Sequence, residues 1–193
     1  MGIYYKGSAI TPCYNSLVKF RQLVDRSITT VTAEDLVGVT SIGSSAFYGC
    51  SSLTSVTIGD GVTSIEYAAF SSCGSLTSVT IGDGVKRIGI YVLNNCSRLT
   101  SVTIKATIPP TLSNVNAFNN TNNCPIYVPY ASITAYSTAS NWASIASRLF
   151  PLVNTIADLQ TIDTTIYTKA CVIGTDNSYK EYTYDGSQWN EVI

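Results

Sequence analysis

The chain has 193 residues, of which 45% are hydrophobic and only 12% are charged, and its net charge is −1. This is enough for one good hydrophobic core with room for a small extra module, and the balanced charge excludes nucleic acid and anionic membranes as main partners. The sequence contains no histidine, which removes histidine-based triads and the commonest zinc ligand, so an enzyme is the least favoured class of protein.

The first 27 residues predict an N-terminal arm followed by a helix. Residues 1–14 have no clear hydrophobic period, and we expect an extended arm that a neighbouring subunit holds in place. From residue 16 to 26, apolar side chains recur at helical spacing, which predicts a helix. This helix would either cover the open end of the next domain or anchor the chain to another protein. The expected assembly contacts are Tyr4, Tyr5, Leu17, Phe20 and Leu23.

The start of the chain lacks the apolar core of a secretory signal behind a positively charged end. No stretch approaches the roughly 18 apolar residues that a membrane-spanning helix needs, so we expect no membrane insertion. The chain is therefore expected to be a mature or cytoplasm-made protein, or one that leaves its cell by another route, such as inside a particle.

A 23-residue unit occurs twice between residues 39 and 84 and a third time, less regularly, from Val85. The first two copies are identical at 17 of their 23 positions. Such a short period indicates a solenoid, because one unit cannot bury its apolar side alone and must stack on its neighbours. Residues 28–38 read as a degenerate first copy.

Each unit contains a strand, a turn, a second short extended piece and a helical turn. In Leu-Thr-Ser-Val-Thr-Ile, apolar residues alternate with Ser and Thr, which predicts a strand with one face in the core and the other facing out. Gly-Asp-Gly predicts a tight turn. The buried side chains of the second unit are expected to be Val62, Ile65, Ala69, Phe70, Leu76, Val79 and Ile81.

Over residues 39–104 the pattern V-x-x-I-G-x-x-A-F-x-x-C-x-x-L-x-x-V-x-I resembles the BspA-like class of leucine-rich repeats. The resemblance implies a leucine-rich-repeat solenoid of short parallel strands and short helical turns, in which Phe and Cys fill each coil. Residues 108–152 are similar to the closing unit of many BspA-like proteins. They predict a proline-bounded strand and helical turns that cover the last coil with Ile133, Tyr136, Trp142, Ile145 and Leu149.

The remaining segment, residues 153–193, predicts a small all-β module beyond the solenoid of residues 28–152. Strands are expected near residues 165–173, 179–184 and 188–192, with a Tyr-Asp-Gly-Ser hairpin turn between the last two. The ending resembles short β modules often found at the ends of bacteriophage tail and fibre proteins. Its aromatic side chains would either contact sugars or protein, or form the core of the module itself.

Three cysteines occupy the same point of three successive units, which predicts side chains that point in parallel. Zinc sites need close pairs, and disulfides need side chains that point at each other. We therefore expect buried free thiols at these positions and no metal or other cofactor. The turn aspartates of two neighbouring units are also too few for a calcium site. The three cysteines are Cys50, Cys73 and Cys96.

Two surfaces could bind a partner: the outward Ser and Thr face of the strands, and the aromatic end of the chain. The strand face suits contact with protein or glycan, or it is only a soluble face. The candidate binding residues are Ser55, Thr57, Ser78, Thr80, Ser101, Thr103, Tyr182, Tyr184 and Trp189.

Two functional hypotheses follow, neither of them enzymatic. The first is a structural and binding protein of a bacteriophage virion, a head or tail fibre or a decoration, which assembles with itself or with other virion proteins and recognises a bacterial surface protein or glycan. The second, implied by the BspA-like resemblance, is a bacterial cell-surface or secreted adhesin that binds host protein or other bacteria.

Overall fold

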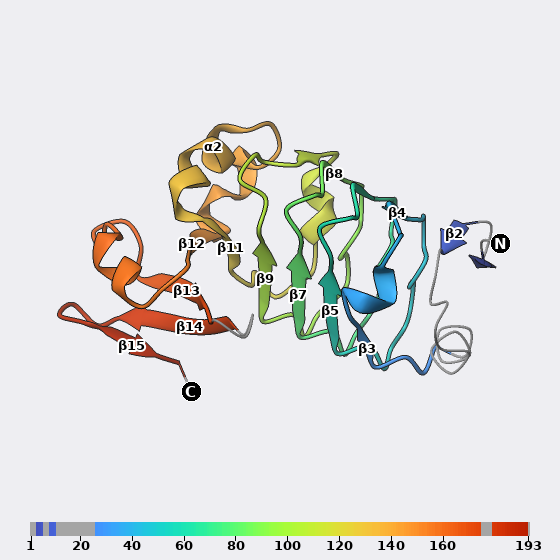
Figure 1. Cartoon of the computed structure of the whole chain (residues 1–193), viewed down its shortest axis with the longest axis horizontal. Helices are drawn as coiled ribbons and strands as arrows, with labels where there is room; N and C mark the ends of the chain where they lie inside the picture. The colour runs from blue at the N-terminus through green and yellow to red at the C-terminus, as the bar shows by residue number, and fades with distance from the viewer. Residues whose placement is uncertain (1–2, 6–7, 11–25, 175–178, 193) are drawn as a thin grey trace.

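The computed structural model describes residues 3–5, 8–10, 26–174 and 179–192 of the chain. In these residues the protein is a solenoid of β-coils that leads into a small antiparallel C-terminal β segment (Figure 1). This confirms the predicted fold class.

The N-terminal arm is described in part. Strand β1 (Ile3–Tyr5) pairs antiparallel with β2 (Ser8–Ile10), and it carries Tyr4 and Tyr5. Whether these tyrosines contact another subunit stays a prediction. Leu17, Phe20 and Leu23, and with them nearly all of the predicted helix, lie outside the described residues.

The first sheet runs along the coils, and its strands are parallel and in register. Ser55 pairs with Ser78 and Ser78 with Ser101, so neighbouring strands repeat at an offset of one unit. The degenerate first coil joins the same sheet, since Val31 pairs with Val56. The strands are β3 (Thr30–Val31), β5 (Ser55–Ile58), β7 (Ser78–Ile81) and β9 (Ser101–Ile104).

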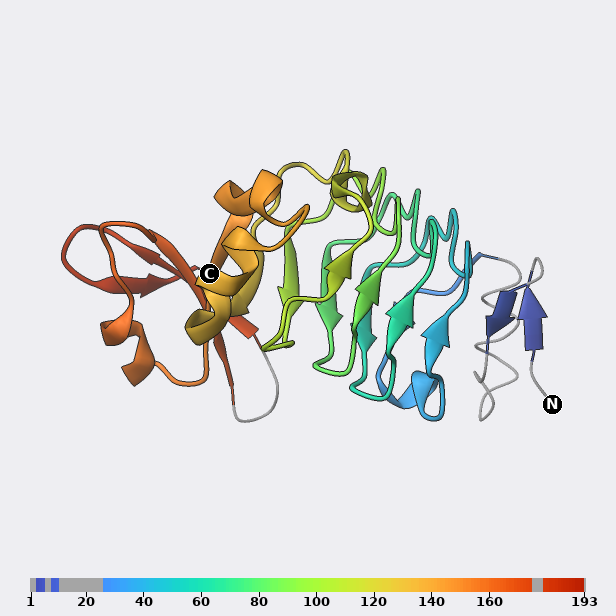
Figure 2. The same cartoon turned by 90° about the horizontal axis from the view of Figure 1, so that it is seen from above.

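A second parallel sheet is formed by the short extended pieces that follow the turns, and the coils succeed one another along the molecule (Figure 2). Backbone hydrogen bonds also join the coils at the corners: the Phe47 N–H donates to the Ala69 carbonyl at 2.7 Å. A 3₁₀ helix, η1 (Glu34–Leu36), lies in the first coil. The strands are β4 (Ser41–Ile42), β6 (Ser64–Ile65), β8 (Arg87–Ile88) and β10 (Thr111–Leu112).

The core lies between the two sheets, and all seven side chains predicted for the second unit are buried there. Phe47 and Phe70 stack with their ring centroids 4.9 Å apart and their planes only 6° from parallel. The thiols of Cys73 and Cys96 donate to the backbone carbonyls of the preceding coil, at 3.1 and 3.2 Å. Cys50 is also buried and free, as expected for side chains that point in parallel.

The closing unit covers the last coil as predicted. The Tyr136 hydroxyl donates to the Ala106 carbonyl at 2.8 Å, and the Trp142 indole N–H donates to the Pro110 carbonyl at 2.7 Å. Both side chains are fully buried and fill the end of the core. The two hydrogen bonds provide their polar atoms with the partners that buried Tyr and Trp side chains usually have. The elements of this unit are η2 (Val115–Phe118), β11 (Ile126–Pro129), η3 (Tyr130–Ser132), α2 (Ile133–Thr138) and η4 (Ala143–Arg148).

Arg148 fastens this closing unit to the loop before β11. Its guanidinium donates to the carbonyls of Cys124 and Phe118 at 3.1 and 3.2 Å, and to the Thr121 hydroxyl at 2.8 Å. Because helix and turn ends leave carbonyls without partners, one planar cation here satisfies several of them.

The first sheet continues without a break into the C-terminal segment, which the sequence did not indicate. Leu149, expected in a helical turn, begins a strand instead, because it pairs with Ile126 of β11. Within the described residues the sheet order is β15-β14-β13-β12-β11-β9-β7-β5-β3, parallel up to β13 and antiparallel beyond. The added elements are β12 (Leu149–Val153), η5 (Ala157–Thr161), β13 (Lys169–Ile173), β14 (Tyr179–Tyr184) and β15 (Trp189–Glu191).

The predicted hairpin turn is present between β14 and β15. The Asp185 carboxylate accepts hydrogen bonds from the backbone N–H groups of Ser187 and Gln188, at 2.8 and 2.9 Å, and these bonds lower the pKa of Asp185. Gly186 has a φ of +101°, which favours glycine. Whether residues 153–193 form a separate folding unit stays a prediction.

Candidate binding surface

The outward side chains of the first sheet form two rows across the coils. One row is Ser55, Ser78 and Ser101, and the other is the threonines two residues further along each strand. Ser78 and Thr57 are exposed, and the first and last serines of the row are half-buried. We refer to these six residues as the hydroxyl face.

The C-terminal end of the hydroxyl face is covered, contrary to the expectation that all its side chains face solvent. Thr80 is only 8% exposed and Thr103 only 4% exposed. The reason is the β13–β14 hairpin, whose residues line the same hollow as these threonines. Repeat periodicity cannot indicate this cover, because the hairpin is not part of the repeat.

A groove of about 330 Å³ lies between the hydroxyl face and the hairpin. Tyr179 and Glu181 of β14 and Cys171 of β13 form the hairpin side, and we call this hollow the hairpin groove. The residues on the solenoid side are Val56, Thr57, Ser78, Val79, Thr80, Ser101 and Thr103.

Several polar atoms in and beside the hairpin groove have no hydrogen-bond partner in the part of the chain that the structure describes. The Tyr179 and Tyr127 hydroxyls are buried without one. The hydroxyls of Thr80 and Thr103 make no hydrogen bond among the described residues either, but their oxygen atoms are not fully buried, although each residue as a whole is more than nine-tenths buried. The two unpartnered tyrosine hydroxyls are uncommon, because most buried polar groups in proteins are hydrogen-bonded.

Tyr127 extends the threonine row, since it pairs with Thr103 on one side and Phe150 on the other. Burial, and then the nearby Glu181 carboxylate, raise the pKa of the Tyr127 hydroxyl. The same two causes raise the pKa of the Cys171 thiol to about 12. Both groups are therefore neutral at physiological pH, and Cys171 is not a nucleophile.

The Cys50 thiol, in the first full coil, is equally inert, since burial raises its pKa to about 11. The described cysteines are free, and no group of three His, Cys, Asp or Glu in the described residues is placed to hold a metal ion. Nor is any described helix long and apolar enough to cross a membrane.

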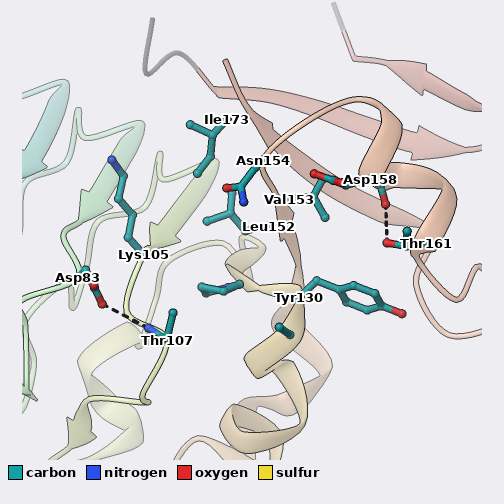
Figure 3. Close-up of a pocket in the computed structure, with 12 residues that line it drawn as sticks. Asp83, Lys105, Thr107, Tyr130, Leu152, Val153, Asn154, Asp158, Thr161 and Ile173 are labelled. Carbon is teal, nitrogen blue, oxygen red and sulfur yellow. Dashed lines mark hydrogen bonds between the residues drawn. The ribbon is translucent and has the colours of Figure 1, made fainter. Parts of the chain in front are cut away.

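A second hollow, of about 700 Å³, separates the last regular coil from the C-terminal segment (Figure 3). Its charged groups are engaged within the protein. The Asp83 carboxylate accepts from the Thr107 N–H at 3.4 Å, and the Asp158 carboxylate accepts from the Thr155 N–H at 2.9 Å. Lys105 has its ammonium group 5.9 Å from the centroid of the Tyr179 ring.

The aromatic end of the chain does not join the hydroxyl face in one site. Tyr182 is only 5% exposed and belongs to the small core of the C-terminal segment, which is the alternative role considered for it. Tyr184 and Trp189 are half-buried, with ring centroids 5.4 Å apart, and they line a separate hollow of about 220 Å³.

Sequence reasoning named the serine and threonine rows, and it named Tyr179 as part of the aromatic end, but it did not name Tyr127 or Glu181. The alternation of the proline-bounded strand does contain a signal for Tyr127, because Ile126 and Val128 face the core. No repeat signal exists for the two β14 residues, whose place depends on how the hairpin packs.

The comparisons with known proteins agree with this geometry. A family model described as a BspA type leucine-rich repeat region matches residues 22–144 in six copies. A comparison with curated proteins gives no match. No catalytic family is detected, and leucine-rich repeat proteins typically bind other proteins rather than catalyse reactions. Because the matched residues make up more than half of its length, the chain belongs to the BspA-type leucine-rich repeat family.

Proposed function

We propose that this chain is the recognition module of a bacterial cell-surface or secreted adhesin, which binds host protein or other bacteria. The observation that carries the proposal is the uncovered part of the hydroxyl face, Ser55, Thr57 and Ser78, which presents polar side chains in register on the first sheet of a BspA-type repeat. Solenoids use such extended surfaces to bind partners, since the coils behind them already supply a complete core.

The family match favours this function over a bacteriophage virion protein. The match covers the solenoid, the part of the chain expected to recognise a partner, and nothing in the comparisons ties the chain to a phage particle. The location at the cell surface or outside the cell is part of the proposal.

The adhesin function predicts that long arginine side chains on the hydroxyl face strongly lower adhesion. Beads that carry the chain should adhere to bacteria or to host cells and matrix, counted by flow cytometry and microscopy. The triple variant Ser55→Arg, Thr57→Arg, Ser78→Arg should lower adhesion at least about tenfold, because long side chains would block close contact across two coils.

The matched control adds three arginines to exposed positions in or beside the second sheet, at Thr40, Thr111 and Ser113. It should adhere as the unchanged protein does. Equal loss in both triple variants would show a general effect of charge, and no adhesion to any of the cells or matrix would contradict the adhesin function.

The proposed location predicts where the protein is found in its source culture. Density-gradient fractionation followed by mass spectrometry should recover its peptides with washed cell envelopes or in the particle-free medium. Recovery in the particle fraction at a fixed ratio to known capsid proteins would instead identify a virion component and overturn the proposed location.

A further inference from the structure

We propose that the hairpin groove is a binding site for a short, uncharged oligosaccharide. This deepens the proposed function and rests on it, because the groove is the covered end of the hydroxyl face. Four features carry the inference: the unpartnered hydroxyls, the spacing of the rows, the Glu181 carboxylate and the size of the groove.

The unpartnered hydroxyls require a ligand that can both donate and accept hydrogen bonds. Thr80, Thr103 and Tyr179 each offer one O–H donor and oxygen lone pairs at the groove, and their hydroxyls have no partner among the described residues. Of the three, only the Tyr179 hydroxyl is fully buried without a partner, and leaving such a group unpaired is unfavourable. The two threonine hydroxyls are open to the groove, where a ligand can pair with them. Sugar hydroxyls match both roles, whereas an apolar ligand matches neither.

The spacing of the rows fits a chain of sugar rings. Thr57, Thr80 and Thr103 lie on consecutive parallel strands, in register. Neighbouring strands are about 4.8 Å apart, which is close to the length of one pyranose unit in an extended oligosaccharide. A saccharide lying across the strands would therefore place one ring near each hydroxyl-bearing strand.

The charge of the groove selects uncharged sugars. Glu181 is its only charged lining residue within the described part of the chain, and a carboxylate can accept hydrogen bonds from two adjacent sugar hydroxyls. Lys105 lies against the Tyr179 ring and is not among the residues that line the groove. Without a cation on the groove wall, phosphate, sulfate and sialic acid groups would be repelled by Glu181.

The size of the groove limits the ligand to a few rings. Its volume of about 330 Å³ lies at the lower end of the usual range for small-ligand pockets, about 300–1,000 Å³. The open part of the hydroxyl face, with Ser55 and Thr57, continues from the groove over the first full coil. A longer glycan could therefore have its terminal rings in the groove and leave along this face.

The test measures direct binding of defined sugars to the full chain. An array of neutral and acidic bacterial and mammalian glycans is screened first. Saturation-transfer difference NMR then measures Kd for the strongest glycan on the array and for glucose, galactose, N-acetylglucosamine and lactose. We expect binding of at least one neutral saccharide and none of its sulfated or sialylated counterparts.

Three conservative variants remove one polar function each: Thr103→Val, Tyr179→Phe and Glu181→Gln. Each should raise the Kd at least about fivefold, because a bound hydroxyl loses a partner. Two matched controls, Tyr67→Phe and Glu191→Gln, change the same chemical groups away from the groove and should leave Kd unchanged. Circular dichroism and melting temperature show that each variant is folded.

Three results would overturn the saccharide site: no neutral glycan binds in either assay, the groove variants bind as tightly as the controls, or N-acetyl-lysine amide binds more tightly than every sugar. The last result would assign the groove to a lysine side chain of a protein partner. The adhesin function is tested separately by the beads. If the triple arginine variant of the hydroxyl face loses adhesion but the three groove variants adhere normally, the adhesin function is supported and the saccharide site is refuted.

Discussion

Replacing Phe70 with alanine is expected to lower the free energy of unfolding by about 3–5 kcal/mol, the usual cost of removing a fully buried phenylalanine. Phe70 is 0% exposed and stacks on Phe47 of the preceding coil. The substitution removes the ring, opens a cavity between two coils and leaves one face of Phe47 without contact. Urea denaturation followed by circular dichroism measures the loss.

The neighbouring coil supplies the control for this substitution. One repeat further on, the position equivalent to Phe70 is Leu93, which is also buried. Phe70→Leu should therefore cost less than about 1.5 kcal/mol, because the next coil already closes around a leucine at this point. An equal loss for alanine and leucine would contradict the filled-volume argument and indicate that the stacked ring itself is required.

Gly84→Ala is expected to destabilise the solenoid by more than about 3 kcal/mol, which places it among the severe substitutions. A β-carbon at Gly84 would fall on the carbonyl oxygen of Asp60 in the preceding turn, and would lie 2.8 Å from the Asp60 carbonyl carbon and 3.2 Å from the Val62 oxygen. All three are backbone atoms, so the turns of two coils would have to move apart. The melting temperature of the purified variant measures the effect.

Gly61 is the equivalent glycine one repeat earlier, and it makes a matched control. A β-carbon there would meet only the Val39 carbonyl oxygen at 3.9 Å, which is an ordinary contact. Gly61→Ala should change stability by less than about 1 kcal/mol. If both alanines destabilised the protein equally, the cause would be the conformation of the Gly-Asp-Gly turn and not the contact between turns.

The sequence was sufficient to predict the solenoid because one local pattern is repeated in register. Once Val56 and Ile58 are placed inside, the period of two along a strand places Thr57 outside, and the 23-residue period carries both assignments to the next coil. The closing unit was predictable for a different reason: Tyr136 and Trp142 are large apolar residues in a segment of short helical turns that follows the last coil, and the end of the core needs a cover.

The candidate site was predictable only where it belongs to the repeat. The hydroxyl rows follow from alternation, but the burial of Thr80 and Thr103 depends on where the β13–β14 hairpin packs. That contact joins residues about 70 to 100 positions apart and follows no period. The role of Tyr182 could not be predicted either. The alternating aromatic pattern is compatible with a binding surface or with a core, and in the structure Tyr182 packs inside the core of the C-terminal segment.

The in-register pairing of β5, β7 and β9 also has a consequence for how such a protein can change over generations. Two of its coils are identical at 17 of 23 positions, and each contacts its neighbours through the same paired positions. Misaligned recombination between their coding segments would add or delete a whole coil without disturbing either end. The length of the exposed face would then change in steps of one strand, about 4.8 Å. The size of the partner surface that this face can contact would change with it, while the two ends that close the core stay the same.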